Sequence, residues 1–213
     1  MIDTEHAHTE HGDTEHADTA PNPALGGLVA GTTPYPWPYD AALSRSRTAV
    51  IVLGWNRGWW ERSDDPAGVA GAISSLAAAV DCAIAIDQAP PTSPVPFHSP
   101  SLAAGSLPEL ADAKSLPAVG VDGFFGGPLD AVLRAAHRDL LILVGLGLEA
   151  AVHSTMRSAN DRGYECLLVV DACAPLLPEL VPSAISMVEM SGGIFGAVGT
   201  TDHVLAALRA APS

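Results

Sequence analysis

The sequence predicts a three-layer α/β/α domain around a six-stranded, mostly parallel sheet, and three observations support this prediction. The length of 213 residues suits one compact domain. Hydrophobic residues make up 48% of the chain, which is enough for a sizeable core. Short, wholly apolar runs alternate with segments of helical character. A wholly apolar run indicates a strand covered on both faces, as in parallel sheets.

The first 33 residues are expected to form a disordered tail outside this domain. They repeat a Thr-Glu-His unit and contain six acidic residues but no Lys or Arg. So polar a segment buries too little apolar surface to offset the entropy lost on ordering. Its histidines alternate with carboxylates and could bind a divalent metal loosely, although a solvated tail is the favoured interpretation. These histidines are His6, His8, His11 and His16.

The domain is expected to span residues 34–213 and to begin with a proline-aromatic arm at 34–39. Such an arm lies extended over a surface, and a neighbouring subunit could provide that surface. The first strand is expected at 48–54, where the apolar run TAVIVL precedes a glycine. An Ala-rich helix follows at 67–80, and a second apolar strand at 82–87.

A long irregular insertion is expected at 88–117, because seven prolines fall within it. A short extended piece follows at 118–121. From residue 128 the alternation is regular, with Pro128 suited to the first position of a helix and Gly163 suited to closing one. We expect helices at 128–137, 149–162, 177–190 and 200–210, and strands at 140–145, 166–171 and 193–198. The strand at 140–145 should lie near the centre of the sheet.

Charge and cysteine content exclude several classes of function. The formal net charge is -14, so nucleic acid would be repelled. No apolar run reaches the roughly 18 residues that cross a bilayer, and the first twenty residues lack a secretory apolar core. A cytoplasmic protein is therefore expected. The three cysteines form no CxxC pair, which argues against a disulfide framework or a zinc site. No metal or other cofactor is expected.

Two motifs in the second half of the chain resemble those of a known family. GLGLEAAVHSTMRSANDRGYECLLVVDACA (145–174) is similar to the signature of the isochorismatase-like cysteine hydrolases, and DGFFGGPLDAVLR (122–134) is similar to an upstream segment of that family. The segments 34–40 and 190–208 look most like the branch that hydrolyses biuret and related ureides. The resemblance covers residues 34–210 and implies an isochorismatase-like fold.

The resemblance also implies where a catalytic triad would stand. In the family a Cys thiolate attacks an amide carbonyl, an Asp accepts the proton and a Lys stabilises charge. The matching positions here are Gly54 for the Asp, Ala118 for the Lys and Ala151 for the Cys. None of these three residues offers an acid, a base or a nucleophile. The resemblance therefore implies the family's fold without its thiol chemistry.

A pocket is nevertheless expected at the carboxyl ends of the strands, where α/β sheets bind their ligands. Trp55, Trp59 and Phe124 follow strand ends and could stack on a planar ligand. They could equally fill the volume left by the lost polar side chains. If the backbone follows the family, the N–H groups of Ala150 and Ala151 lie at a helix N-terminus and suit an anion or a polarised carbonyl.

Four polar residues are candidates for a remodelled catalysis that uses no thiol. Asp87 ends a strand, and Asp122 could act as an acid in the cleft or cap the turn before Phe124. Glu149 opens a helix, where interaction with the helix dipole is the alternative role. His98 lies in the loop that would cover the pocket, where simple exposure to solvent is the alternative.

Two further residues could substitute for the lost groups. Lys114 could extend into the pocket from the insertion, and Cys173 could reach the rim of the pocket. The alternative for Lys114 is a solvent-exposed side chain without a catalytic role. The alternative for Cys173 is an unreactive thiol, because no base is adjacent to it in the sequence.

Three functions follow as hypotheses. The first is a pseudoenzyme that binds a small planar ligand, or that assembles with itself as a homo-oligomer or with an active paralogue as a hetero-oligomer. The second is an enzyme with remodelled acid–base chemistry on a small metabolite. The third is a scaffold or interaction subunit whose pocket is filled, and tightly packed tryptophans would favour it.

Overall fold

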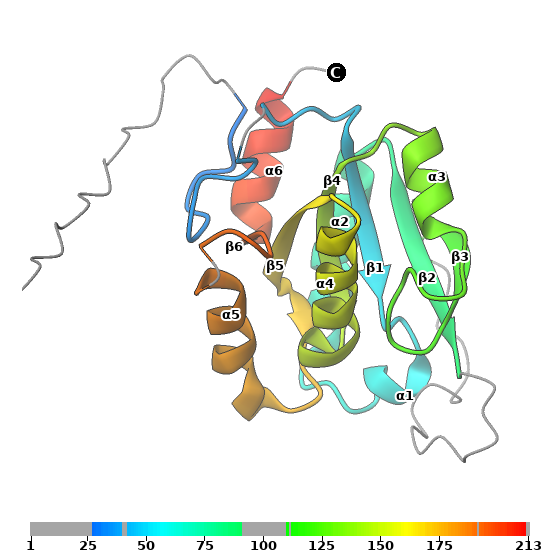
Figure 1. Cartoon of the computed structure of the whole chain (residues 1–213). Helices are drawn as coiled ribbons and strands as arrows, with labels where there is room; N and C mark the ends of the chain where they lie inside the picture. The colour runs from blue at the N-terminus through cyan, green and yellow to red at the C-terminus, as the bar shows by residue number, and fades with distance from the viewer. Residues whose placement is uncertain (1–26, 40–41, 91–109, 111, 191, 212–213) are drawn as a thin grey trace, which may run out of the picture.

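A six-stranded parallel sheet forms the centre of the molecule, as the apolar runs predict (Figure 1). The computed structural model describes residues 27–39, 42–90, 110, 112–190 and 192–211. The strand order is β3-β2-β1-β4-β5-β6, and every neighbouring pair is parallel. The strands are β1 (Thr48–Leu53), β2 (Ala83–Ala89), β3 (Lys114–Val119), β4 (Leu140–Leu146), β5 (Glu165–Ala174) and β6 (Ala197–Gly199).

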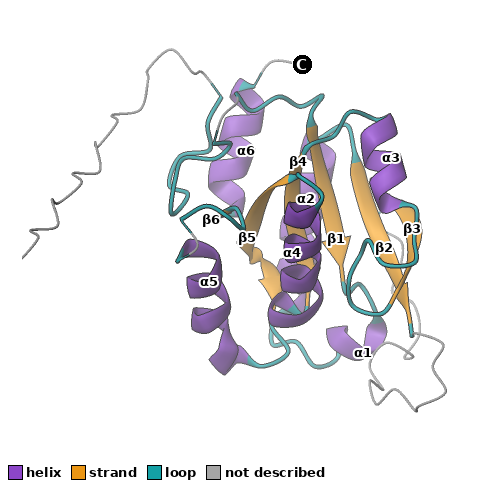
Figure 2. Ribbon diagram, in the orientation of Figure 1, coloured by secondary structure: helices purple, strands orange, loops and turns teal. Residues whose placement is uncertain are grey.

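Helices cover both faces of the sheet and complete the three layers (Figure 2). Helices α2 and α6 contact each other and β5 on one face, whereas α3, α4 and α5 cover the other. None of the helices in the described ranges is both long and apolar enough to cross a membrane. The helical segments are α1 (Arg57–Trp60), α2 (Pro66–Ala79), α3 (Leu129–Ala135), the π-helical turn η1 (Leu148–Val152), α4 (His153–Asp161), the 3₁₀ turn η2 (Pro178–Leu180), α5 (Val181–Glu189) and α6 (Thr201–Ala210).

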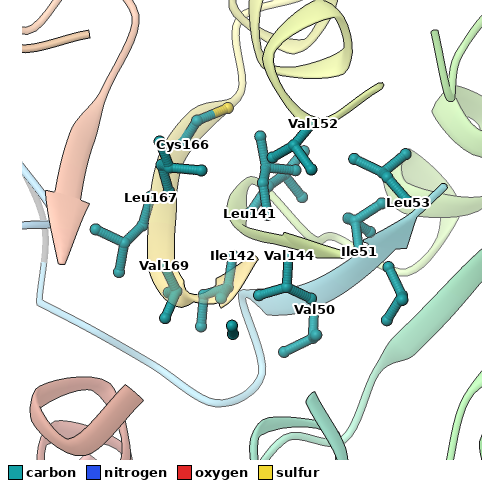
Figure 3. Packing of buried hydrophobic residues seen from close by; sticks show 14 of the residues in the cluster. Val50, Ile51, Leu53, Leu141, Ile142, Val144, Val152, Cys166, Leu167 and Val169 are labelled. Atoms are coloured by element: carbon teal, nitrogen blue, oxygen red, sulfur yellow. The ribbon is translucent and has the colours of Figure 1, made fainter. Parts of the chain in front are cut away.

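Buried side chains of β1, β4 and β5, which run side by side, pack together in the core (Figure 3). Every residue of β1 and β4 is buried, on both faces of the sheet. The two strands pair without interruption from Thr48 opposite Leu140 to Leu53 opposite Gly145. The prediction that 140–145 lies near the sheet centre is confirmed, and the apolar runs are explained by burial on both faces.

The ordered domain begins earlier than the sequence predicts. The expected tail ended at residue 33, yet Val29 and Trp37 are fully buried, and the Val29 N–H donates to the Trp37 carbonyl at 2.7 Å. Thr33 exchanges two backbone hydrogen bonds with Val198 of β6 (3.0 and 2.8 Å). The proline-aromatic arm therefore lies on its own subunit, at the β6 edge of the sheet. Residues 1–26, including the four tail histidines, lie outside the described residues.

The second departure concerns the insertion and the strands around it. Strand β2 continues to Ala89 and β3 begins at Lys114, so the ends of the expected irregular stretch at 88–117 belong to the sheet. Proline-based reasoning misses β3 because Pro117 lies within it. An edge strand tolerates this proline, since β3 is paired on one side alone. Helix α3 also differs slightly, because Pro128 occupies the N-cap position rather than the first helical one.

Candidate functional site

The carboxyl ends of β1, β2, β3 and β4 meet at one edge of the sheet, where α/β proteins bind their ligands. The three positions that the resemblance matches to a catalytic triad all lie at this edge. Gly54 follows β1 directly, Ala118 is the penultimate residue of β3, and Ala151 lies in η1 after β4. Ala118 and Ala151 are buried. Small residues thus occupy all three positions, with no ionisable group among them.

The backbone at Gly54 leaves no room for a side chain. Its φ is +63°, in the left-handed region that residues with a Cβ rarely adopt. A Cβ built there would lie 2.1 Å from the Leu146 carbonyl oxygen and 2.5 Å from the Trp59 ring. Both separations are far below van der Waals contact. An aspartate at this position therefore requires the neighbouring backbone and the indole to move.

Trp59 covers the place where that side chain would stand. Its helix α1 is absent from the sequence prediction and is held by Asn56, whose Oδ1 accepts the Trp59 N–H at 3.0 Å. The Trp59 side chain is only 2% exposed and belongs to the hydrophobic core. A Cβ on Gly147 would also lie 2.5 Å from the same ring, so the indole packs over two glycines at once.

Burial removes Trp59 from the set of ligand-stacking aromatics that the sequence suggested. Trp55 and Trp60 are half-buried and pack edge to face, with ring centroids 5.4 Å apart. The indole N–H of Trp59 has no hydrogen-bond partner among the described residues. Packing rather than polar contact therefore holds Trp59, in line with the alternative that these aromatics fill vacated volume.

Gln88 is a site residue that sequence reasoning missed. Its buried side chain accepts a hydrogen bond from the Gly54 N–H (2.7 Å) and donates to the Val121 carbonyl (2.5 Å). It thereby joins the ends of β1 and β2 to the segment after β3. A signal was available in the sequence, because successive side chains of a strand point to opposite faces of the sheet. If Asp87 points to solvent, then Gln88 points into the protein. Asp87 lies within β2 rather than at its end, and its side chain points away from Gln88.

Asp122 binds the turn after β3 to helix α4. One carboxylate oxygen accepts the Phe124 N–H at 2.9 Å, and the other accepts the Ser158 hydroxyl at 2.8 Å. The Gly123 N–H donates to the Thr155 hydroxyl at 2.9 Å. The capping role that the sequence allowed for Asp122 is thus observed, and both of its oxygens are engaged in the protein's own structure.

Phe124 is packed inside the protein rather than open to a ligand. It is 5% exposed and stacks on Tyr164, with centroids 5.6 Å apart and planes inclined by 26°. The Arg162 guanidinium lies 4.8 Å from its centroid. Tyr164 in turn donates to Asp130 at 2.8 Å, and burial together with this hydrogen bond raises the pKa of Tyr164 to about 12. The aromatic pair joins the turn after β3 to the segment after α4, and Tyr164 links this segment to α3 through Asp130.

Glu149 braces the loop after β5 instead of facing an open cleft. Its carboxylate accepts the backbone N–H groups of Leu176 (2.9 Å) and Leu177 (2.7 Å). The Ala150 N–H donates to the Gly147 carbonyl at 3.0 Å, and the Val152 N–H donates to the same carbonyl at 3.3 Å, as the π-helical turn η1 requires. The Ala150 N–H is therefore engaged within the protein. The side chain of Ala151 is fully buried, and a ligand contact of the Ala151 N–H stays a prediction.

Lys114 and Cys173, the remaining candidates within the described residues, supply no reactive group at this edge. Lys114 is the first residue of β3, at the amino edge of the sheet, so it does not reach the expected pocket. Cys173 is buried, and burial raises the pKa of its thiol to about 12, which keeps the sulfur protonated at neutral pH. His98 lies outside the described residues. Within the described ranges no group of three His, Cys, Asp or Glu side chains is placed to hold a metal ion.

A cavity of about 430 Å³ opens at the opposite, amino edge of the sheet. It is lined by Arg47, Arg134, His137 and Asp139. Arg47 makes a two-pronged contact with Asp139 (2.9 and 2.5 Å), and Arg134 pairs with Asp130 at 3.0 Å. Each arginine at this cavity is therefore already paired with a carboxylate of the same chain, which leaves neither guanidinium unpaired for an anionic ligand.

Comparisons with known proteins agree with this fold. The model of the isochorismatase domain family matches residues 99–203. A cysteine hydrolase from Pseudomonas syringae pv. phaseolicola 1448A superposes with a TM-score of 0.62 at 21% identity, over 78% of this chain and 94% of that one. N-carbamoylsarcosine amidase from Thermoplasma acidophilum gives 0.56 at 18% identity, over 73% and 97%.

A third structure is informative about assembly. The YcaC gene product of Escherichia coli, described as an octameric hydrolase of unknown specificity, has a TM-score of 0.61 at 21% identity. The match covers 78% of this chain and 81% of that one. Together with the strand order and the matched domain, these similarities establish an isochorismatase-like fold.

Proposed function

We propose that the chain is an isochorismatase-family protein without thiol hydrolysis, and that it acts as a subunit of an assembly. The motifs at 122–134 and 145–174 and the family match over 99–203 support membership. The absence of hydrolysis is proposed from Gly54, Ala118 and Ala151, which stand where the resemblance places the acid, the lysine and the nucleophile.

The packing of Trp59 over Gly54 is the observation that carries this proposal. A hydrolase of this kind needs an ionised carboxylate beside its thiol, and the indole occupies the volume that such a carboxylate would need. When catalytic triads are removed from other hydrolases, about 10³–10⁴-fold acceleration over water remains, which is too little for useful amide turnover. The filled space supports the interaction-subunit hypothesis over a ligand-binding one. A planar ligand stays a prediction, with half-buried Trp55 as its remaining aromatic contact.

Self-association is proposed for the same protein. The octameric assembly of the Escherichia coli YcaC product, which shares this fold, supports it. Oligomers of one chain are mostly closed and symmetric, so a single self-complementary surface suffices to form a pair. A hetero-oligomer with an active paralogue is the alternative that the sequence analysis left open.

The test of the catalytic half is a hydrolysis panel on the purified full chain. Ammonia release is measured with biuret, an N-carbamoyl amino acid and simple amides, and pyruvate release with isochorismate; an active cysteine hydrolase of this fold serves as positive control. We expect no release above the buffer blank. Turnover that disappears in Cys173→Ser would overturn the proposal by showing thiol chemistry from another cysteine.

The same panel tests the remodelled enzyme. Turnover that persists in Cys173→Ser but disappears in Asp122→Asn, Glu149→Gln or Asp87→Asn would establish acid–base catalysis instead. Because Asp122 and Glu149 also hold backbone segments in place, circular dichroism of each variant accompanies its activity. Loss of activity with unchanged folding then separates a catalytic from a structural role.

A further inference from the structure

Helix α5 and the residues next to it carry both buried and exposed apolar side chains. Ala184 and Val188 are buried against the body of the domain. Leu180, Met187 and Met190 lie just before, within and just after the helix, and all three are exposed, Met190 by 77%.

The exposed apolar surface continues beyond both ends of this helix. Leu177 precedes it, and Ile194, which is 71% exposed, follows it. We call the five exposed side chains Leu177, Leu180, Met187, Met190 and Ile194 the α5 patch. Five of the seven large exposed hydrophobics in the described chain fall in this patch, so they are concentrated rather than scattered. Concentrated exposure of this kind marks an interaction surface, whereas single exposed hydrophobics do not.

The charge distribution indicates a second copy of this chain as the occupant. A formal net charge of -14 makes two copies repel each other over most of their surface. Residues 181–188 of α5 contain no charged side chain. Glu189, which follows them, is turned to its own subunit, where its carboxylate accepts the Thr33 hydroxyl at 2.6 Å. Two copies that meet through α5 therefore avoid the repulsion.

The rim of the patch suits a two-fold contact. Arg157 lies beside it, with its guanidinium 4.0 Å from the Met187 sulfur and 4.1 Å from the Phe195 ring centroid. Glu179 is exposed near the other end of the patch. In a two-fold arrangement the antiparallel copies bring unlike ends together, so each arginine can approach the other copy's glutamate. Met and Arg are also among the residues enriched in protein interfaces.

We propose that the α5 patch is the surface through which two copies of this chain associate. The inference rests on the self-association proposed above and adds the surface that performs it. Exposed Ser183 lies between Leu180 and Met187 on the same helix face. Because this side chain is small, the two helices can approach closely at the centre of the contact.

The experiment compares three proteins by size-exclusion chromatography with light scattering at about 10 μM, where a dissociation constant of micromolar or below gives dimers. They are the wild type, the double variant Met187→Asp/Met190→Asp, and Phe125→Asp as the matched control. Phe125 is a similarly exposed apolar side chain, but it lies in the turn after β3. We expect oligomers for the wild type and the control. The double variant should be monomeric, with a dissociation constant raised by about 100-fold or more.

The outcomes separate the two proposals. An oligomeric double variant would overturn the α5 patch as the interface while leaving self-association intact, and a monomeric wild type would overturn both. If the double variant fails to fold by circular dichroism, Ser183→Cys decides the question with a short bis-maleimide cross-linker. A cross-linked pair that the wild type does not give supports the inference, and the absence of that pair contradicts it.

Discussion

Substituting Gly54 by alanine measures directly how completely Trp59 and Leu146 fill the candidate site. The matched control is Gly163→Ala. Gly163 has a similar positive φ of +82°, but a Cβ there meets nothing within 4 Å. The control therefore isolates the cost of placing a residue with a Cβ in the left-handed region, about 1–2 kcal/mol.

Gly54→Ala carries the same backbone cost and a packing cost in addition. The new Cβ must displace a carbonyl at 2.1 Å and an indole at 2.5 Å, and overpacking of this kind costs about 1–3 kcal/mol. We expect Gly54→Ala to lower the free energy of unfolding by about 2–5 kcal/mol in total. In a domain of this size, the excess over the control corresponds to a drop in Tm of roughly 2–12 °C.

Urea denaturation followed by circular dichroism, with thermal melts in parallel, gives both free energies. If Gly54→Ala lowers the free energy of unfolding by no more than Gly163→Ala does, then the Trp59 indole and the Leu146 carbonyl move aside at no measurable cost in stability. In that case the site is open to a side chain, and the reasoning from the filled volume is refuted.

Three further outcomes are expected. The hydrogen bond from Tyr164, and then that from Arg134, holds the pKa of Asp130 below its ordinary value of 3.8. The ionised Asp130 therefore stabilises the folded state fully above about pH 4, and this contribution is lost as the pH falls through the lowered pKa. Tyr164→Phe should therefore cost about 1 kcal/mol in urea melts at pH 7, and less at pH 3. A thiol reagent at pH 8 should label half-buried Cys82 in the native protein but Cys173 only in denaturant, as mass spectrometry would show. Glu149→Ala should lower the free energy of unfolding by about 1 kcal/mol, measured by urea denaturation, because it removes the acceptor of two backbone N–H groups that lie partly in solvent.

The sheet was predictable because its central strands are buried on both faces. Such strands read as wholly apolar runs, and β1 and β4 match the predicted strands to within a residue at either end. The ends of the other strands were harder to predict from the sequence. Strand β5 runs on to Ala174 through an irregular register between Leu143 and Gly145 of its neighbour β4, which no local pattern encodes.

The sequence predicts where the candidate site lies, but it does not predict which of the side chains there are buried and which are open to a ligand. Its place follows from parallel topology, and the small residues there are visible in the sequence. Whether an aromatic residue is open to a ligand or buried depends on contacts from distant segments. Trp59 rests on Gly54 and Gly147, which are 93 residues apart in the numbering, and Phe124 rests on Tyr164. Gln88 was missed because the strand was expected to end at residue 87, so the alternation that buries Gln88 was not extended to it.

The intact mass of the protein during exposure to an amide substrate shows directly whether the chain carries out thiol hydrolysis. Thiol hydrolysis requires a covalent acyl intermediate on sulfur, and rapid acid quenching preserves such an adduct. We expect the unmodified mass of 21.8 kDa at every time point, because alanine stands at position 151 and Cys166 and Cys173 are buried. An acyl adduct that forms and decays with the substrate, and that maps to any cysteine of this chain, would contradict the proposed absence of thiol hydrolysis.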